Sequence, residues 1–208
     1  MLLDADESQL ILIDLQARLM PAIHDSAAVV ANAVRLGRMA RLLNVPVWGT
    51  EENPARLGDN VAEVRALCGR VLPKMHFSAV ADGLADWLRP PVRAQQGGNV
   101  RSLPKHLQKA APAQAQTQAQ AQARNTLVLA GCETHVCLLQ TALDLLDEEF
   151  EVWVVTDACG SRSERNRDAA FDRLAAAGAE LVTTEMVAFE WLRTAEHPLF
   201  KDVLALVR

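Results

Sequence analysis

Residues 126–146 read TLVLAGCETHVCLLQTALDLL, and this stretch decides the fold that we expect. The apolar run from Leu127 to Ala130 is typical of a buried strand, and Gly131 marks a turn. Beyond the turn, apolar side chains recur at the spacing of one helix face: Val136, Leu139, Leu143 and Leu146. The stretch therefore predicts a strand, a tight turn and a helix.

Cys137 falls in the first turn of this predicted helix, just beyond the carboxyl end of the strand. Unpaired backbone N–H groups and the positive end of the helix dipole favour a thiolate there, so we expect the pKa of Cys137 to be lowered. A buried cysteine is, however, usually inert packing. Position alone leaves both interpretations open.

Strands and helices alternate along the rest of the chain. Further strands are expected at 9–15, 45–48, 71–72, 151–156 and 180–183, and helices at 26–43, 59–67, 77–88, 163–176, 185–193 and 198–207. The alternation predicts a three-layer α/β/α sandwich, with a doubly wound, Rossmann-like, six-stranded and mostly parallel sheet. Ligands of such sheets bind beyond the carboxyl ends of the strands.

Two other reactive side chains follow predicted strands at that same edge. Asp14 ends the apolar run of residues 9–15, and Lys74 follows the short strand at 71–72. Each has an ordinary alternative, since Asp14 can be a solvated loop acid and Lys74 a surface residue. Together with Cys137 they are complementary: the carboxylate can accept the thiol proton, the ammonium can stabilise the thiolate, and backbone N–H groups of the turn at 133–137 can hold an oxyanion.

The composition narrows the classes of function. A chain of 208 residues that is 50% hydrophobic favours one domain, and a net charge of −5 without a basic block argues against a nucleic-acid partner. We find neither a signal peptide nor a membrane-length apolar run, so we expect a cytoplasmic protein with no membrane partner.

The four cysteines, Cys68, Cys132, Cys137 and Cys159, lack C-x-x-C spacing and are expected to be free thiols. Cys132, His135 and Cys137 lack a fourth ligand, so no metal is expected.

The segment at about 90–124 interrupts the alternation. Its second half, AAPAQAQTQAQAQAR (110–124), is an Ala/Gln low-complexity tract, for which a frayed helix and disorder remain alternatives. It precedes the strand at Leu127 and so is expected at the amino edge of the sheet, opposite the reactive side chains. We therefore expect one domain, 1–208, with an insertion that does not build the site.

Three motifs in this order resemble those of the isochorismatase-like cysteine hydrolases, a superfamily that includes nicotinamidases and N-carbamoylsarcosine amidohydrolase. They are D-x-Q at Asp14 and Gln16, P-K-x-x-F-S at 73–78, and G-x-E-T-H-x-C-x-x-Q-T-A at 131–142. The segments ETHVCLLQTALDLL, VTDACGSRS and HPLFKDVL are most similar to the branch called isochorismatase domain-containing proteins. The resemblance covers nearly the whole chain except about 90–124.

The resemblance implies a catalytic triad of Asp14, Lys74 and Cys137. It also implies a cis peptide between Cys132 and Glu133, with the backbone amides of Glu133 and Cys137 forming an oxyanion hole, and a homo-oligomer, either a dimer or a tetramer. Nicotinamidases have an Asp-x-His metal motif after the second strand, whereas this chain has no His between His24 and His76. Isochorismatases that cleave the vinyl ether lack the cysteine nucleophile, so that reaction is disfavoured here.

We therefore expect a metal-independent cysteine hydrolase, without cofactor, that cleaves an amide-like C–N bond of a small molecule through a thioester. Substrate contacts are expected from the strand-end residues Gln16, Trp48, Glu51, Phe77 and Thr134. His135 is expected to be structural or to line the pocket rather than act as the base. A non-catalytic module that binds a ligand or a protein is the alternative. A redox role for Cys137, with Cys132 as resolving thiol, is the least favoured.

Overall fold

The computed structural model describes residues 1–89 and 124–208 of the chain. The insertion expected at about 90–124 therefore lies outside the described residues, apart from Arg124. Within the described ranges, no helix is both long enough and apolar enough to cross a membrane.

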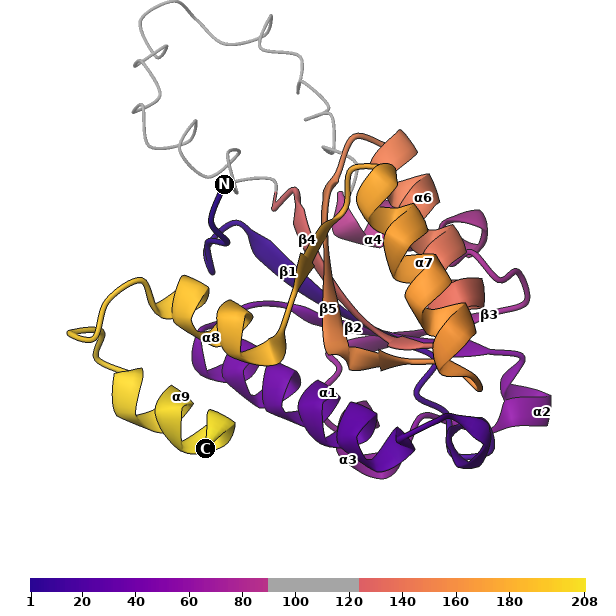
Figure 1. Ribbon diagram of the computed structural model, residues 1–208, viewed down its shortest axis with the longest axis horizontal. Coiled ribbons are helices and arrows are strands. Elements are labelled where there is room, and N and C mark those ends of the chain that lie inside the picture. The colour runs from indigo at the N-terminus through magenta and orange to yellow at the C-terminus, as the bar shows by residue number, and fades with distance from the viewer. Residues whose placement is uncertain (90–123) are drawn as a thin grey trace, which may run out of the picture.

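A six-stranded sheet forms the middle layer, in the order β3-β2-β1-β4-β5-β6 (Figure 1). Every neighbouring pair is parallel, which confirms the predicted doubly wound sheet. The strands are β1 (Ser8–Ile13), β2 (Val47–Glu52), β3 (Arg70–Lys74), β4 (Thr126–Cys132), β5 (Glu151–Gly160) and β6 (Glu180–Val182).

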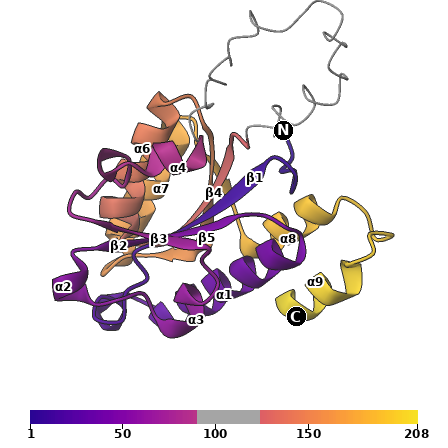
Figure 2. The ribbon, with the colours of Figure 1, turned by 180° about the vertical axis from the view of Figure 1, so that it is seen from behind.

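Helices cover both faces of this sheet, as Figures 1 and 2 show from opposite sides. One face carries α4 (Leu84–Leu88), α6 (Leu139–Asp147) and α7 (Glu164–Ala176). The other carries α1 (Ser26–Leu42), α8 (Thr184–Leu192) and α9 (Phe200–Val207). The shorter elements are η1 (Met20–Ala22), α2 (Pro54–Leu57), α3 (Ala62–Arg65), η2 (Val80–Asp82) and the π-helical turn η5 (Thr134–Leu138).

Strand side chains alternate between two apolar cores. Leu10 and Leu12 of β1 pack beneath α1, whereas Ile11 and Ile13 pack with Leu72 and Leu138 on the side of α6. This alternation of successive strand residues decides which strand-end side chains share a face. Asp14 lies one residue beyond β1, and its positive φ of 49° ends the alternation there.

Several boundaries differ from the sequence prediction. The strand expected at 45–48 runs on to Glu52, and that expected at 71–72 includes Pro73 and Lys74, which an edge strand tolerates. The helix expected at 77–88 is broken at Gly83, whose φ is 93°, into η2 and α4. The helix expected at 59–67 is reduced to α3 and is preceded by α2.

Gly131 allows β4 to pass very close to β1. Its φ is 134°, and a Cβ at this position would lie 2.0 Å from the carbonyl oxygen of Ile13. Only glycine fits both the backbone conformation and the space. The close approach brings the end of β4, and with it the turn that carries Cys137, beside the end of β1.

The two residues that flank the undescribed segment are fixed at the amino edge. Arg89 donates to the carbonyl oxygens of Glu148 and Glu149, at 2.7 and 2.9 Å. Arg124 donates to the carbonyl oxygens of Ala5 and Ser8, each at 2.8 Å. Both flanks therefore lie at the sheet edge opposite Cys137, as the sequence predicted.

Candidate active site

The carboxyl ends of β1 to β4 bring four reactive side chains together. Asp14 follows β1, Glu52 and Lys74 end β2 and β3, and Cys137 lies in η5 beyond β4. These strands are neighbours in the sheet, so residues far apart in the sequence meet at one edge. This is the edge where parallel sheets bind ligands.

Asp14 and Lys74 form a buried ion pair. Asp14 Oδ2 lies 2.8 Å from Lys74 Nζ, and both side chains have an exposed fraction of 0%. The hydroxyl of Thr50 donates to Asp14 Oδ1 at 2.6 Å. The carboxylate is therefore held from both sides in a place that water does not reach, where ionic contacts are stronger than at the surface.

The ammonium of Lys74 is saturated with acceptors. It donates to Glu52 Oε2 at 2.8 Å and to the backbone oxygens of His76 and Phe77 at 3.2 and 3.1 Å, in addition to the ion pair with Asp14. Burial works to lower the pKa of Lys74, but the charge of Asp14 and the hydrogen bonds from Asp14 and Glu52 outweigh it and raise that pKa. Lys74 is therefore a permanent cation in this site.

Glu52 is a member of the site that the sequence analysis missed. Its side chain is 12% exposed, and oxygens of Glu52 and Asp14 lie with the Cys137 sulfur within 4.8 Å of one another. The sequence predicts Glu51 as the substrate contact instead, because the strand at 45–48 was expected to end before it. Recognising that β2 continues would have placed Trp48, Thr50 and Glu52 on one face by their alternation.

Cys137 is 6% exposed and lies in the π-helical turn η5 that links β4 to α6. Burial raises the pKa of the Cys137 thiol, the charge of Asp14 raises it further, and Lys74 lowers it by less. The expectation of a lowered pKa was therefore wrong. The sequence argument considered only the local helix end, whereas burial and two nearby carboxylates come from distant segments.

The turn before Cys137 is firmly anchored. The Cys132–Glu133 peptide is cis, as the resemblance implied. The Glu133 carboxylate accepts from the backbone N–H and the Nε of Arg162, at 2.9 and 3.0 Å. His135 Nδ1 lies 2.9 Å from the hydroxyl of Ser161, which ties this ring to the segment before α7.

Two of the five expected substrate contacts lie deep in the protein. Gln16 is fully buried, and its side chain bonds the backbone N–H and C=O of Glu52 at 3.0 and 2.9 Å and the C=O of Gly58 at 2.6 Å, so it fixes the end of β2. Thr134 is also fully buried, and its Oγ1 has no hydrogen-bond partner among the described residues.

The other three expected contacts lie at different distances from the thiol. Trp48 shares the face of Glu52 but lies further back along β2, where its Nε1 donates to Gln9 at 2.8 Å. Phe77 contributes its carbonyl oxygen to Lys74, and its residue is 52% exposed. Glu51 points away from Lys74 and accepts from the backbone of Asn60 at 2.8 Å and from Arg65 at 3.1 Å.

Among the residues that the structure describes, Asp14, Glu52 and Cys137 could offer ligand atoms to a metal ion at this edge. The Lys74 ammonium, however, lies 2.8 Å from a carboxylate oxygen of both acids. A bound divalent cation would have to displace this buried ammonium or lie against it. The charge arrangement therefore fits thiol chemistry better than metal binding.

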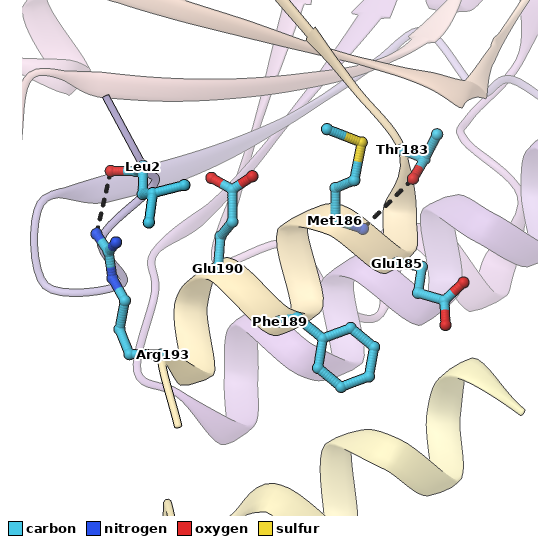
Figure 3. A pocket seen from close by; sticks show the side chains of 7 residues that line it. All are labelled: Leu2, Thr183, Glu185, Met186, Phe189, Glu190 and Arg193. Atoms are coloured by element: carbon cyan, nitrogen blue, oxygen red, sulfur yellow. Dashed lines mark hydrogen bonds between the residues drawn. The ribbon is translucent and has the colours of Figure 1, made fainter. Parts of the chain in front are cut away.

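A separate hollow of about 450 Å³ lies along the outer side of α8 (Figure 3). It is lined by Leu2, Thr183, Glu185, Met186, Phe189, Glu190 and Arg193. Arg193 closes one end by donating to the carbonyl oxygen of Leu2 at 3.1 Å. It contains none of the reactive residues, since α8 covers the face of the sheet opposite α6 and α7.

Comparisons with known proteins agree with this geometry. Residues 8–186 match the family described as "Isochorismatase domain". Isochorismatase domain-containing protein 2A of Mus musculus is 34% identical over 203 residues, which cover 98% of this chain and 84% of the relative. The corresponding protein 2 of Bos taurus is 36% identical over 201 residues, covering 97% and 83%.

Solved structures give the same result. The MAR1 ribonuclease of Caenorhabditis elegans superposes with a TM-score of 0.76 at 28% identity, covering 100% of this chain and 92% of that one. The YcaC gene product of Escherichia coli, described as an octameric hydrolase of unknown specificity, has a TM-score of 0.72 at 25% identity and coverage of 99% and 87%.

Proposed function

Because this chain belongs to the isochorismatase family and has its hydrolase fold, we propose that it is a metal-independent cysteine hydrolase that cleaves an amide-like C–N bond of a small molecule. One observation carries the proposal. The fully buried ion pair of Asp14 and Lys74, 2.8 Å long, lies beside the Cys137 thiol at the ligand-binding edge of the sheet. A buried carboxylate within reach of a thiol is the arrangement that general-base activation needs.

In the first step, Asp14 takes the S–H proton as the sulfur attacks the carbonyl carbon. The raised pKa of Cys137 means that the resting thiol keeps its proton, so proton transfer has to accompany attack. The carbonyl π electrons move to oxygen, and backbone N–H groups of Glu133 and Cys137 stabilise the oxyanion. Lys74 holds the carboxylate in position and balances the charge that develops.

In the second step, the tetrahedral intermediate collapses to a thioester as the C–N bond breaks. Asp14, which now carries the proton, gives it to the departing nitrogen, so an amine or ammonia leaves. Water then attacks the thioester with Asp14 again as base. Sulfur leaves and regains the proton, and the product is the carboxylic acid.

The decisive experiment is to trap the thioester. Wild-type protein is incubated with a panel of small amides, ureas and activated esters, and the intact mass is recorded after acid quenching. We expect an added acyl mass located at Cys137, and turnover that Cys137→Ala lowers at least about 100-fold. Turnover that survives in Cys137→Ala would overturn the proposal. An RNA oligonucleotide belongs in the panel because a relative is described as a ribonuclease.

A second candidate is a module that binds a ligand at this edge without turning it over. The raised pKa of Cys137 favours it, because a protonated thiol is a poor nucleophile. It predicts no acyl adduct and no turnover with any member of the panel, in wild type and Cys137→Ala alike. The same experiment therefore separates the two candidates.

We also propose that the protein is a homo-oligomer. The E. coli relative is described as octameric, and large apolar side chains of this chain are exposed, among them Leu2 at 58% and Met186 at 45%. Contiguous exposed apolar surface on a soluble protein usually marks an interface. Light scattering after size exclusion should give a multiple of the chain mass of 22.7 kDa, and a monomer at micromolar concentration would contradict this.

A further inference from the structure

We propose that Glu52 determines which substrates the site accepts according to their charge. It accepts a hydrogen bond from an N–H of the group next to the scissile carbon, and it excludes substrates that place a carboxylate there. The inference rests on the proposed function, because it assumes that Cys137 is the attacking atom. It names the substrate class, which is a carboxamide or urea with a free N–H, or a cationic amide.

The first argument is the charge balance of the buried cluster. Two carboxylates, Asp14 and Glu52, share one ammonium, that of Lys74. The Cys137 thiol keeps its proton and is therefore neutral, so it does not change this charge balance. The cluster therefore carries one excess negative charge in a poorly solvated place, where charge is costly unless a partner arrives.

The second argument is that Lys74 has no free N–H group with which to bind a substrate anion. Its three N–H groups serve four acceptors within 3.2 Å, namely Asp14 Oδ2, Glu52 Oε2 and the carbonyl oxygens of His76 and Phe77. Its side chain has an exposed fraction of 0%. A substrate carboxylate beside the thiol would meet two carboxylates, and Lys74 would have no free N–H with which to bind it.

The third argument is the position of the free Glu52 oxygen. Lys74 occupies Oε2, whereas Oε1 has no hydrogen-bond partner within residues 1–89 and 124–208. Of the three charged side chains, that of Glu52 alone reaches solvent, at 12% exposed. A carboxylate oxygen of Glu52 lies within 4.8 Å of the Cys137 sulfur, which is near enough for a group bonded to the attacked carbon to reach this side chain.

The test uses two alkylating agents of nearly the same shape, iodoacetamide and iodoacetate. One presents an N–H donor beside the reacting carbon, and the other presents a carboxylate. Their rates at Cys137 are measured by peptide mass spectrometry on the full-length protein, each divided by its rate with glutathione. The ratio of the two normalised rates isolates the preference of the site, because the nucleophilicity of the thiol cancels.

We expect wild type to prefer iodoacetamide at least about tenfold over iodoacetate, and Glu52→Gln to remove most of this preference. Glu63→Gln is the matched control, since it removes the same charge from an exposed position on α3. It should keep the wild-type ratio. A Glu52→Gln ratio equal to that of wild type would overturn the inference, as would a wild-type ratio near one.

This test needs no turnover, so it separates the two proposals. A charge preference that depends on Glu52, together with no acyl adduct on any substrate, would retain the role of Glu52 and reject the hydrolase. An acyl adduct with a ratio insensitive to Glu52 would do the reverse. Circular dichroism and the urea midpoint of each variant confirm that the ratio is measured on folded protein.

Discussion

Asp14 affects the Cys137 thiol in two opposite ways. In the resting protein its negative charge raises the pKa of that thiol, second only to burial. In the mechanism that we propose, the same carboxylate accepts the thiol proton during attack, and it is held by Lys74 at 2.8 Å and Thr50 at 2.6 Å. Under this proposal, Asp14 helps to keep the resting thiol protonated and then assists its attack on a bound substrate.

This dual role gives a prediction for Asp14→Asn. Loss of the charge should lower the pKa of Cys137, so that more thiolate is present at pH 8 and alkylation by iodoacetamide becomes about tenfold faster per pKa unit. Turnover should nevertheless fall at least about 100-fold, because an amide cannot accept the proton. The alkylation rate and turnover therefore move in opposite directions.

Asp147→Asn is the control, because Asp147 is exposed at the end of α6. Both quantities should stay at the wild-type value in this variant. Slower alkylation of Cys137 in Asp14→Asn would show that Asp14 activates the thiol at rest, contrary to the raised pKa. Alkylation is followed across pH 6.5 to about 10.5, so that the rates of the two proteins are compared at each pH.

At the scale of elements, the end of β2 shows how far a strand boundary could be predicted from the sequence. Two consecutive acidic residues are typical of a loop, because charged residues rarely occupy a buried strand. Here distant partners bind both carboxylates: Asn60 and Arg65 bind Glu51, and Lys74 binds Glu52. The parallel sheet followed from the alternation of strands and helices, and the cis peptide before Glu133 followed from the motifs of the resemblance. The extension of β2 depended on contacts between segments, which local patterns do not contain.

The close passage of β4 past β1 makes a second prediction. Gly131→Ala would place a methyl group 2.0 Å from the Ile13 carbonyl oxygen at a φ of 134°, and should cost more than about 4 kcal/mol or prevent folding. Gly178→Ala is the matched control, since its φ of 100° is also unfavourable for alanine but nothing lies within 4 Å of the added Cβ. It should cost about 1–2 kcal/mol.

Both variants are compared by soluble yield and by the midpoint of urea unfolding. Equal destabilisation would mean that backbone strain, and not the approach of β4 to β1, explains the need for glycine at position 131.

At the scale of the whole molecule, folding raises the pKa of all four cysteine thiols. The pKa values of Cys68 and Cys159 are raised to about 11 and about 12, mainly by burial, and those of Cys132 and Cys137 are raised as well. A raised pKa in the folded state means that the folded protein binds a proton which the unfolded chain releases near pH 9.0. The stabilising contribution is complete below that pH and is lost as the pH rises further.

We therefore predict that the free energy of unfolding decreases between pH 9 and about 10.5, and that it decreases less steeply in Cys137→Ala. The other three cysteines are present in both proteins, so the difference in slope reports Cys137. Urea titrations at half-unit pH steps measure it. Between pH 6.5 and 8 the two stabilities should differ by a constant amount; parallel curves above pH 9 would contradict a raised pKa.

Gln9 bonds to both sides of the undescribed segment. Its amide donates to the carbonyl oxygen of Leu88 at 3.1 Å and to that of Arg124 at 2.8 Å, so one side chain joins the points where the segment leaves and rejoins the fold. The chain therefore leaves the fold after Leu88 and rejoins it at Arg124 at the same place on the sheet. Over evolutionary time, the gene can lengthen, shorten or replace this stretch without shifting any strand register, and natural selection can act on its length independently of the chemistry at Cys137.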